Sequence, residues 1–210
     1  MASSAPFDLA HFKKASFFER QANEETSHWK LEQLEGRLVE LSGAECSSAL
    51  SLCFDLILQA QNKNEPVAWL STENSIFFPP DTQANGIDLE ALPVIALPSH
   101  QALGIATERL LRSGAFSLLV LDLGSHQELS LAMQSRLASL AQKHATAVVF
   151  ITQKTPDIAS LGSLISLRAH TRYLHCGEDA FLCELEVLKD KRHAPGDKHQ
   201  ILLSAPEGLL

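Results

Sequence analysis

The residues from Gly43 to Leu50 are the part of this sequence whose position best suits phosphate chemistry. They lie between an apolar run at 37–42 and a helix expected over 49–61. A nucleotide-binding loop at such a junction has the pattern GxxxxGK[ST]. Gly43 keeps the first glycine, whereas Ser48 stands in place of the second.

Two further replacements in this loop remove its charge and its metal ligand. Ala49 stands where the pattern has the lysine that neutralises the phosphates, and Leu50 stands where it has the hydroxyl that holds magnesium. Only backbone amides would be left to hold a nucleoside triphosphate. We therefore expect a vestigial nucleotide site, with no catalytic residue and no bound cofactor.

The cysteines and histidines do not form a recognisable metal-binding motif. The four cysteines make two pairs seven residues apart, neither with CxxC spacing: Cys46 with Cys53, and Cys176 with Cys183. His170, His175 and Cys176 are close in sequence but lack the spacing of a zinc site. We expect buried, reduced thiols and no metal ion.

Composition restricts the class of protein. The chain has 210 residues, of which 45 % are hydrophobic and 20 % charged, as in a single folded domain. No apolar run approaches the length of a membrane span and the N-terminus has no signal-like pattern, so we expect a cytoplasmic protein without membrane contact. The net charge of −8 argues against a broad nucleic-acid-binding surface, although 188–200 is locally basic.

From Gly36 onward, short apolar runs alternate with longer segments of helical periodicity, which is typical of βαβ units. The strands expected on this basis lie at 37–42, 67–71, 93–97, 117–123 and 147–152, nearly all apolar and so buried on both faces. Helices are expected at 49–61 and 101–112, followed by a third that begins with a capping box of Ser125 and Glu128. Strands at 171–175, 181–188 and 200–203 should form an antiparallel meander.

These elements predict an α/β fold with a mostly parallel central sheet, flanking helices and a C-terminal antiparallel meander. The core domain is expected over 36–210, after an N-terminal arm at 1–35 that is partly helical. The arm is rich in apolar side chains that could anchor it on a partner or on a second copy of the chain, or fold back onto the domain. These side chains are Phe7, Leu9, Phe12, Phe17 and Phe18.

Six segments, in order, resemble the ATPase core of the RecA recombinase family. They are GRLVELSGAE, VAWLSTE, QALGIATERLLRSGAFSLLVLD, VVFITQ, LEVLKDKRHAP and HQILLSAPEGL, and they are distributed along the chain from Gly36 to its end. The resemblance is greatest to the ImuA family, the degenerate RecA-like component of bacterial translesion mutasomes. It implies a RecA-like P-loop NTPase core that lacks the C-terminal domain of RecA.

The resemblance also implies roles for individual residues. Glu73 falls at the carboxylate that activates the hydrolytic water, Asp122 at the Walker B carboxylate, and Gln153 at the switch glutamine. Lys189 and Lys191 match a lysine pair that reaches the ATP of a neighbouring subunit. The connection from Gln153 to the next strand is short, so we expect DNA to be bound only weakly or indirectly.

A catalytically inactive interaction subunit is the function that these features favour. The resemblance implies that it binds RecA and an ImuB-like homologue of Y-family polymerases, with possible self-association, in SOS-induced translesion synthesis and DNA damage tolerance. The alternatives are a SulA-like cell-division inhibitor or a recombinase-paralogue adaptor, which would share the fold but bind another partner. An active DNA-dependent ATPase is opposed by Ala49 and Leu50.

Overall fold

The computed structural model describes residues 29–44, 47–72, 86–125, 129–175, 180–193, 196 and 198–204. Several residues with a predicted role lie outside the described residues: Phe7, Leu9, Phe12, Phe17, Phe18 and Glu73. Predictions about them stay predictions.

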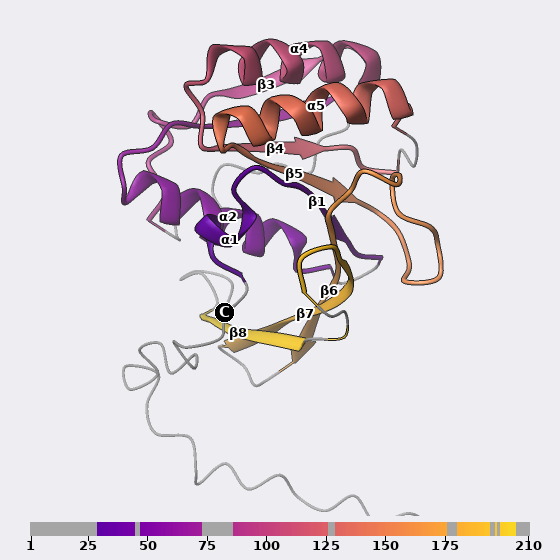
Figure 1. Ribbon diagram of the computed structural model, residues 1–210. Helices are drawn as coiled ribbons and strands as arrows, with labels where there is room; N and C mark the ends of the chain where they lie inside the picture. Colours follow the sequence, from indigo (N-terminus) through magenta and orange to yellow (C-terminus); the bar gives the residue numbers. More distant parts are fainter. Residues whose placement is uncertain are drawn as a thin grey trace, which may run out of the picture.

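One eight-stranded sheet runs through the molecule in the order β3-β2-β4-β5-β1-β6-β7-β8 (Figure 1). Its strands are β1 (Leu38–Ser42), β2 (Val67–Thr72), β3 (Val94–Leu97), β4 (Leu118–Asp122), β5 (Ala147–Thr152), β6 (Leu167–His175), β7 (Ala180–Asp190) and β8 (Lys198–Ser204). The pairings from β3 to β6 are parallel, and β7 and β8 add antiparallel pairings. The predicted α/β fold with an antiparallel C-terminal meander is confirmed.

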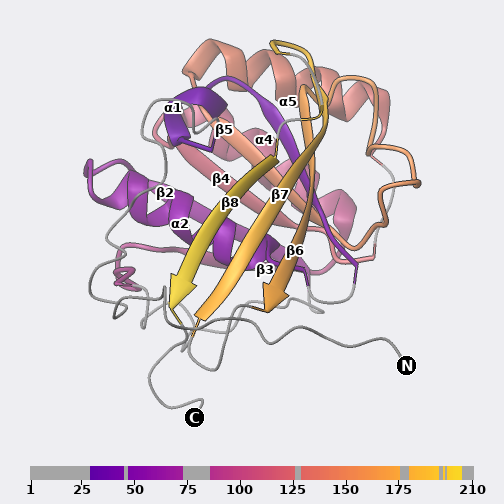
Figure 2. The same ribbon diagram turned by 90° about the horizontal axis from the view of Figure 1, so that it is seen from below.

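Helices cover both faces of the parallel part of the sheet. The described helices are α1 (Leu31–Leu34), α2 (Ala49–Gln61), α4 (His100–Ser113) and α5 (Leu131–His144). Figures 1 and 2 show α1 and α2 on one face and α4 and α5 on the other, so the sheet separates two apolar cores. Among the described residues, no helix is both long and apolar enough to span a membrane.

The burial of the strands follows their place in the sheet. Every residue of β1, β4 and β5 is buried, as expected for central parallel strands. The expectation that the strand near 93–97 is also buried on both faces is wrong. β3 is an edge strand whose side chains are exposed or half-buried, with Val94 44 % exposed.

The start of α5 differs from the prediction. The helix begins at Leu131, and its cap is Ser130, whose hydroxyl accepts a hydrogen bond from the Met133 amide at 3.3 Å. The capping box predicted at Ser125 is therefore wrong. Ser130 has no acidic residue three positions later, so a pattern that requires the reciprocal carboxylate passes over it.

A buried ion pair joins the ends of three strands. Arg37, just before β1, donates through Nη2 to Asp190 Oδ1 at the end of β7, at 2.5 Å, and their side chains are 2 % and 5 % exposed. Arg37 also bonds the hydroxyl and carbonyl of Ser166, just before β6, at 2.9 and 3.0 Å. Burial alone would raise the pKa of Asp190, but hydrogen bonds from the Arg192 amide and from Arg37 outweigh it and hold that pKa below its ordinary value.

Asp190→Asn should lower the free energy of unfolding by about 3 kcal/mol at pH 7, because it leaves a buried guanidinium without its counter-charge. A carboxyl whose folded pKa is depressed stabilises the fold above its unfolded pKa of about 4, and this contribution is lost as the pH falls through the folded pKa. The difference from wild type should therefore shrink between neutral pH and about pH 3. Urea unfolding at both pH values measures this.

The matched control for this prediction is Lys63→Gln, which removes an exposed ion pair with Glu32. It should leave the unfolding midpoint nearly unchanged. A destabilisation by Asp190→Asn that is equally large at acid pH would show that the loss does not come from the Asp190 charge.

Candidate functional site

Three residues predicted for the vestigial nucleotide site lie at one edge of the sheet. Gly43 follows β1, Asp122 ends β4 and Gln153 follows β5, so all three are at the carboxyl ends of parallel strands. Backbone hydrogen bonds join these ends, from the Gly43 amide to the Thr152 carbonyl at 3.1 Å and from the Gln153 amide to the Gly124 carbonyl at 2.8 Å. This is the edge where α/β sheets bind ligands.

The Ser47 side chain fills the space beside Gly43. A methyl group placed on Gly43 would lie 2.1 Å from Ser47 Oγ, so only glycine fits there. Ser47 Oγ accepts a hydrogen bond from the Ala49 amide at 3.2 Å and pairs with Thr171 Oγ1 at 3.0 Å. The first amide of α2, a group that an anion at a helix N-terminus would use, is therefore already satisfied by the chain's own hydroxyl.

Further hydroxyl contacts fasten the start of α2 to β6. Ser48 Oγ donates to the Arg172 carbonyl at 3.2 Å, and Ser51 Oγ pairs with the Tyr173 hydroxyl at 2.5 Å. We call this set the hydroxyl seam: Ser47, Ser48 and Ser51 on the α2 side, and Thr171, the Arg172 carbonyl and Tyr173 on the β6 side. Ser48 and Ala49 are buried within it, and Leu50 packs against the apolar core.

Sequence reasoning identified Ser48 as a replaced glycine but missed its partners in the seam. Part of the signal was present, because Thr171 and Tyr173 are two residues apart on a strand and so project from one face of it. On the other side, Ser47 and Ser48 lie just before the helix and Ser51 lies in its first turn. Pairing the two sides required knowing that β6 lies beside β1.

Asp122 and Gln153 differ in exposure. Asp122 is 2 % exposed, and its Oδ1 accepts a hydrogen bond from the Gly124 amide at 3.0 Å, which fixes the turn after β4. The Gln153 side chain is exposed. Burial, with a smaller effect from the charge of Asp122, raises the pKa of the Cys53 thiol.

The two cysteines that the structure describes are free and buried, as expected. Burial raises the pKa of Cys183 to about 11, so this thiol is neutral at physiological pH. Cys46 and Cys176 lie outside the described residues. Within the described part of the chain, no three His, Cys, Asp or Glu side chains gather in a way that could hold a metal ion.

Lys189 and Lys191 do not form an evenly exposed pair. β7 ends at Asp190, so strand alternation does not extend to Lys191, which is exposed. Lys189 is half-buried, and its Nζ donates to the Gly162 carbonyl at 3.4 Å. Burial lowers the pKa of Lys189, and the nearby charge of Lys191 lowers it further. Lys191 is therefore the more accessible cation.

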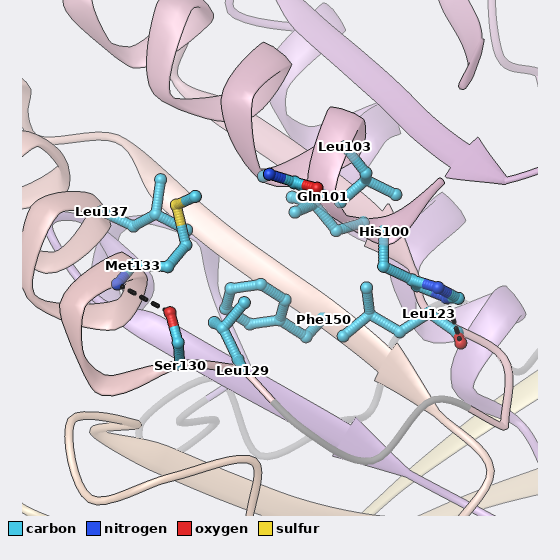
Figure 3. Close-up of a pocket in the computed structure, with 11 residues that line it drawn as sticks. His100, Gln101, Leu103, Leu123, Leu129, Ser130, Met133, Leu137 and Phe150 are labelled. Carbon is cyan, nitrogen blue, oxygen red and sulfur yellow. Dashed lines mark hydrogen bonds between the residues drawn. The ribbon is translucent and has the colours of Figure 1, made fainter. Parts of the chain in front are cut away.

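Two apolar grooves flank α4. The larger, of about 360 Å³, lies between β3 and α4 and includes Ile95, Leu97, Ile105 and Leu110. The second, of about 310 Å³, lies between α4 and α5 at the end of β4, with Met133 and Phe150 among its lining residues (Figure 3). Ile105 is 42 % exposed, so apolar surface reaches solvent on this side of the sheet.

Comparison with known proteins relates this chain to RecA, both through a family model and through individual relatives. The family model of the RecA N-terminal domain matches residues 33–161. Protein RecA of Bdellovibrio bacteriovorus is 34 % identical over 213 aligned positions, which cover 83 % of this chain and 56 % of that protein. Protein RecA of Fusobacterium nucleatum is 32 % identical over 139 residues, which cover 56 % of this chain and 36 % of that protein.

A third relative matches over the same length as the Fusobacterium nucleatum protein. Protein RecA of Phytoplasma mali is 30 % identical over 139 residues, or 56 % of this chain and 40 % of that protein. The chain therefore spans between about a third and just over half of the length of these relatives, from 36 % to 56 %. The matched family region contains the Gly43 loop, Asp122 and Gln153.

Ser47→Ala should lower the free energy of unfolding by about 1 kcal/mol, because it removes the hydroxyl that caps the Ala49 amide and pairs with Thr171. Urea unfolding measures this loss. Ser163→Ala, at an exposed position, is the matched control and should change stability little. Equal stability of the Ser47 variant and wild type would contradict a closed phosphate loop.

Proposed function

Because this chain belongs to the RecA family, we propose that it is a catalytically inactive RecA-like protein that works as an interaction subunit in DNA damage tolerance. The observation that carries this proposal is the closure of the phosphate loop by Ser47. RecA is the first proposed partner, and the family resemblance favours a mutasome role with an ImuB-like polymerase homologue in SOS-induced translesion synthesis.

Loss of catalysis follows from the chemistry that the loop lacks. Phosphoryl transfer from ATP needs a cation at the terminal phosphates and a held magnesium ion. Ala49 and Leu50 supply neither, and Ser47 uses the amide and the space that a phosphate would need. Asp122 and Gln153 then have no phosphate or metal on which to act.

Partner binding is proposed to use the β3–α4 groove. An exposed apolar groove beside an edge strand is suited to a partner that brings apolar side chains and an extended backbone. Ile105, which is 42 % exposed, lines this groove together with Ile95 and Leu97 of the edge strand β3. The arm residues Phe7, Leu9, Phe12, Phe17 and Phe18 are proposed as a second set of anchors, on a partner or on another copy of the chain.

Lys191 is proposed to contribute to RecA binding by charge. Its exposed ammonium can meet a carboxylate or the bound nucleotide of a neighbouring RecA subunit, while Lys189, whose Nζ bonds the Gly162 carbonyl, is the less accessible of the two. DNA is proposed to be bound only through partners or weakly. A SulA-like division inhibitor or a recombinase-paralogue adaptor would share the closed loop and differ in the partner captured.

The chain should not hydrolyse ATP, and its dissociation constant for MgATP should be no tighter than about 1 mM. Isothermal titration calorimetry and a phosphate-release assay measure these quantities. Ala49→Lys alone should restore neither ATP hydrolysis nor tight MgATP binding, because the Ser47 hydroxyl still lies beside Gly43 and no residue replaces the magnesium ligand. Micromolar, magnesium-dependent binding by the wild-type chain would refute the proposed inactivity.

The chain should be captured by RecA filaments loaded with a slowly hydrolysed ATP analogue, and Ile105→Glu should weaken this capture at least about tenfold, because it places a charge in the β3–α4 groove. Lys191→Glu should weaken capture and reduce its salt dependence. Biolayer interferometry at two salt concentrations measures both effects.

Leu131→Glu is the matched control for this capture experiment, because Leu131 is an apolar side chain 62 % exposed at the start of α5. It should bind RecA like wild type. If Ile105→Glu binds normally, RecA is not recognised through the β3–α4 groove. If RecA captures neither the wild-type chain nor any variant, the partner is another protein. A SulA-like division inhibitor or a recombinase-paralogue adaptor then becomes the better account.

A further inference from the structure

Glu40 is a carboxylate in the middle of a fully buried strand. It belongs to β1, its side chain is 0 % exposed, and its register partners are Phe150 on β5 and Arg168 on β6. A charge in such a place is very costly unless it is paired and hydrogen-bonded. The groups that satisfy Glu40 therefore constrain whatever segment carries them.

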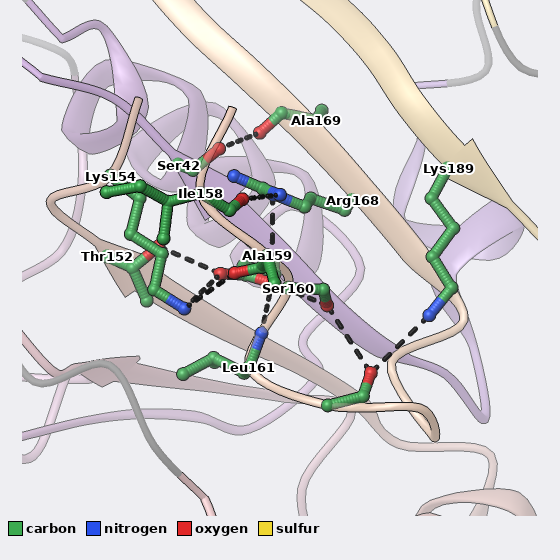
Figure 4. Close-up of polar contacts among 12 residues, drawn as sticks. Ser42, Thr152, Lys154, Ile158, Ala159, Ser160, Leu161, Arg168, Ala169 and Lys189 are labelled. Atoms are coloured by element: carbon green, nitrogen blue, oxygen red, sulfur yellow. Dashed lines mark hydrogen bonds and ion pairs between the residues drawn. The ribbon is translucent and has the colours of Figure 1, made fainter. Parts of the chain in front are cut away.

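Most of these groups come from the connection between β5 and β6 (Figure 4). Lys154 Nζ lies 3.2 Å from Glu40 Oε1, and Arg168 Nε lies 3.9 Å from Oε2. The carboxylate accepts three further hydrogen bonds, from Thr152 Oγ1 at 3.2 Å, Ser160 Oγ at 2.8 Å and the Leu161 amide at 2.9 Å. One carboxylate thus holds two cations and the backbone of the connection.

The two cations in turn hold carbonyl groups of the same connection. Lys154 Nζ donates to the Ala159 carbonyl at 3.3 Å, and Arg168 donates to the Ile158 carbonyl and, at 3.1 Å, to the Thr155 carbonyl. Lys154 and Arg168 are only 2 % and 5 % exposed. Both side chains point inward to Glu40 and the connection, although long basic side chains usually reach water.

We propose that Glu40 is the internal counter-anion of a charge clamp, formed with Lys154 and Arg168. This clamp keeps the β5–β6 connection closed against β1 and withholds both cations from solvent. Without the Glu40 charge, two buried cations would have no counter-charge. The connection between them is the segment that can move to hydrate them, because Lys154, Ser160 and Leu161, which contact Glu40, all belong to it. Leu161 and Ile165 also anchor this connection in the apolar core.

The clamp also positions the start of α5. The Gln134 side chain, 3 % exposed, donates to the Leu129 carbonyl at 2.6 Å and to the Leu161 carbonyl at 3.3 Å, and accepts from the Leu164 amide at 3.1 Å. A methyl group on Gly162 would lie 2.0 Å from Gln134 Nε2, so the connection packs closely on this amide. The closed connection therefore fixes Leu129, one wall of the α4–α5 groove.

The test compares Glu40→Gln with Glu186→Gln in the full chain. Both variants remove one negative charge, but Glu186 is 37 % exposed and pairs with Lys198 on the meander. Hydrogen exchange of the amides at 155–164 and the salt concentration of elution from immobilised heparin, a generic polyanion, are measured for each. Glu40→Gln should speed exchange at 155–164 at least about 100-fold while β4 stays protected.

Both variants change the net charge equally, so a difference in their heparin retention reports exposure of Lys154 and Arg168. Glu40→Gln should elute at clearly higher salt than Glu186→Gln, because only the former releases Lys154 and Arg168. Equal retention of the two variants, or unchanged exchange at 155–164 in Glu40→Gln, would overturn the clamp.

Two further measurements test the proposal if the Glu40→Gln chain does not fold. The double variant Glu40→Gln with Lys154→Met removes one of the two excess cations, so it should recover structure and part of the protection at 155–164. In the wild-type chain, the Leu161 amide, bonded to Glu40, should exchange at least about 100-fold more slowly than an unprotected amide. Exchange of Leu161 at the unprotected rate, or a double variant no better folded than the single one, would refute the proposal.

Discussion

The buried carboxylate of Glu40 is the interaction on which the arrangement around β1 depends. β1 lies between β5 and β6, so a carboxylate buried there needs cations and hydrogen-bond donors from both neighbours and their connection. Lys154 and Arg168 meet this need and shape the connection around them. Beyond the end of the same strand, the hydroxyl seam gives the polar groups at the start of α2 their hydrogen-bond partners on β6. β6 therefore contributes partners both at Glu40 and at the start of α2.

These two features occupy the space around β1. Ser47 fills the space beside Gly43 at the carboxyl end of the strand, and the β5–β6 connection, whose Leu161 amide bonds Glu40, packs on the face that α5 covers. The apolar surface of α4 and of β3, the edge strand, stays exposed. A RecA-family chain with a closed ligand edge and an open apolar flank is better suited to bind proteins than to turn over a nucleotide, which is why we favour an interaction subunit.

Apolar periodicity was sufficient to predict the parallel strands and α4, because burial on both faces leaves continuous hydrophobic runs. It placed the start of β6 too late, since Arg168 and His170 break the run that begins at Leu167. Arg168 is buried there because Glu40 and the Ile158 and Thr155 carbonyls satisfy it. The seam partners of Ser47 were missed for a related reason, since contacts between Ser47 and Thr171 span 124 positions and follow from sheet order. Local patterns contain no such information.

Hydrogen exchange of the wild-type chain, followed once with MgATP and once with ATP-loaded RecA filaments, is the most direct test that the chain binds a protein with its phosphate loop closed. The account predicts that MgATP leaves the amides at 43–50 unchanged, and that RecA slows exchange over 94–110, which includes β3 and most of α4. Slower exchange at 43–50 with MgATP, and none over 94–110 with RecA, would contradict it.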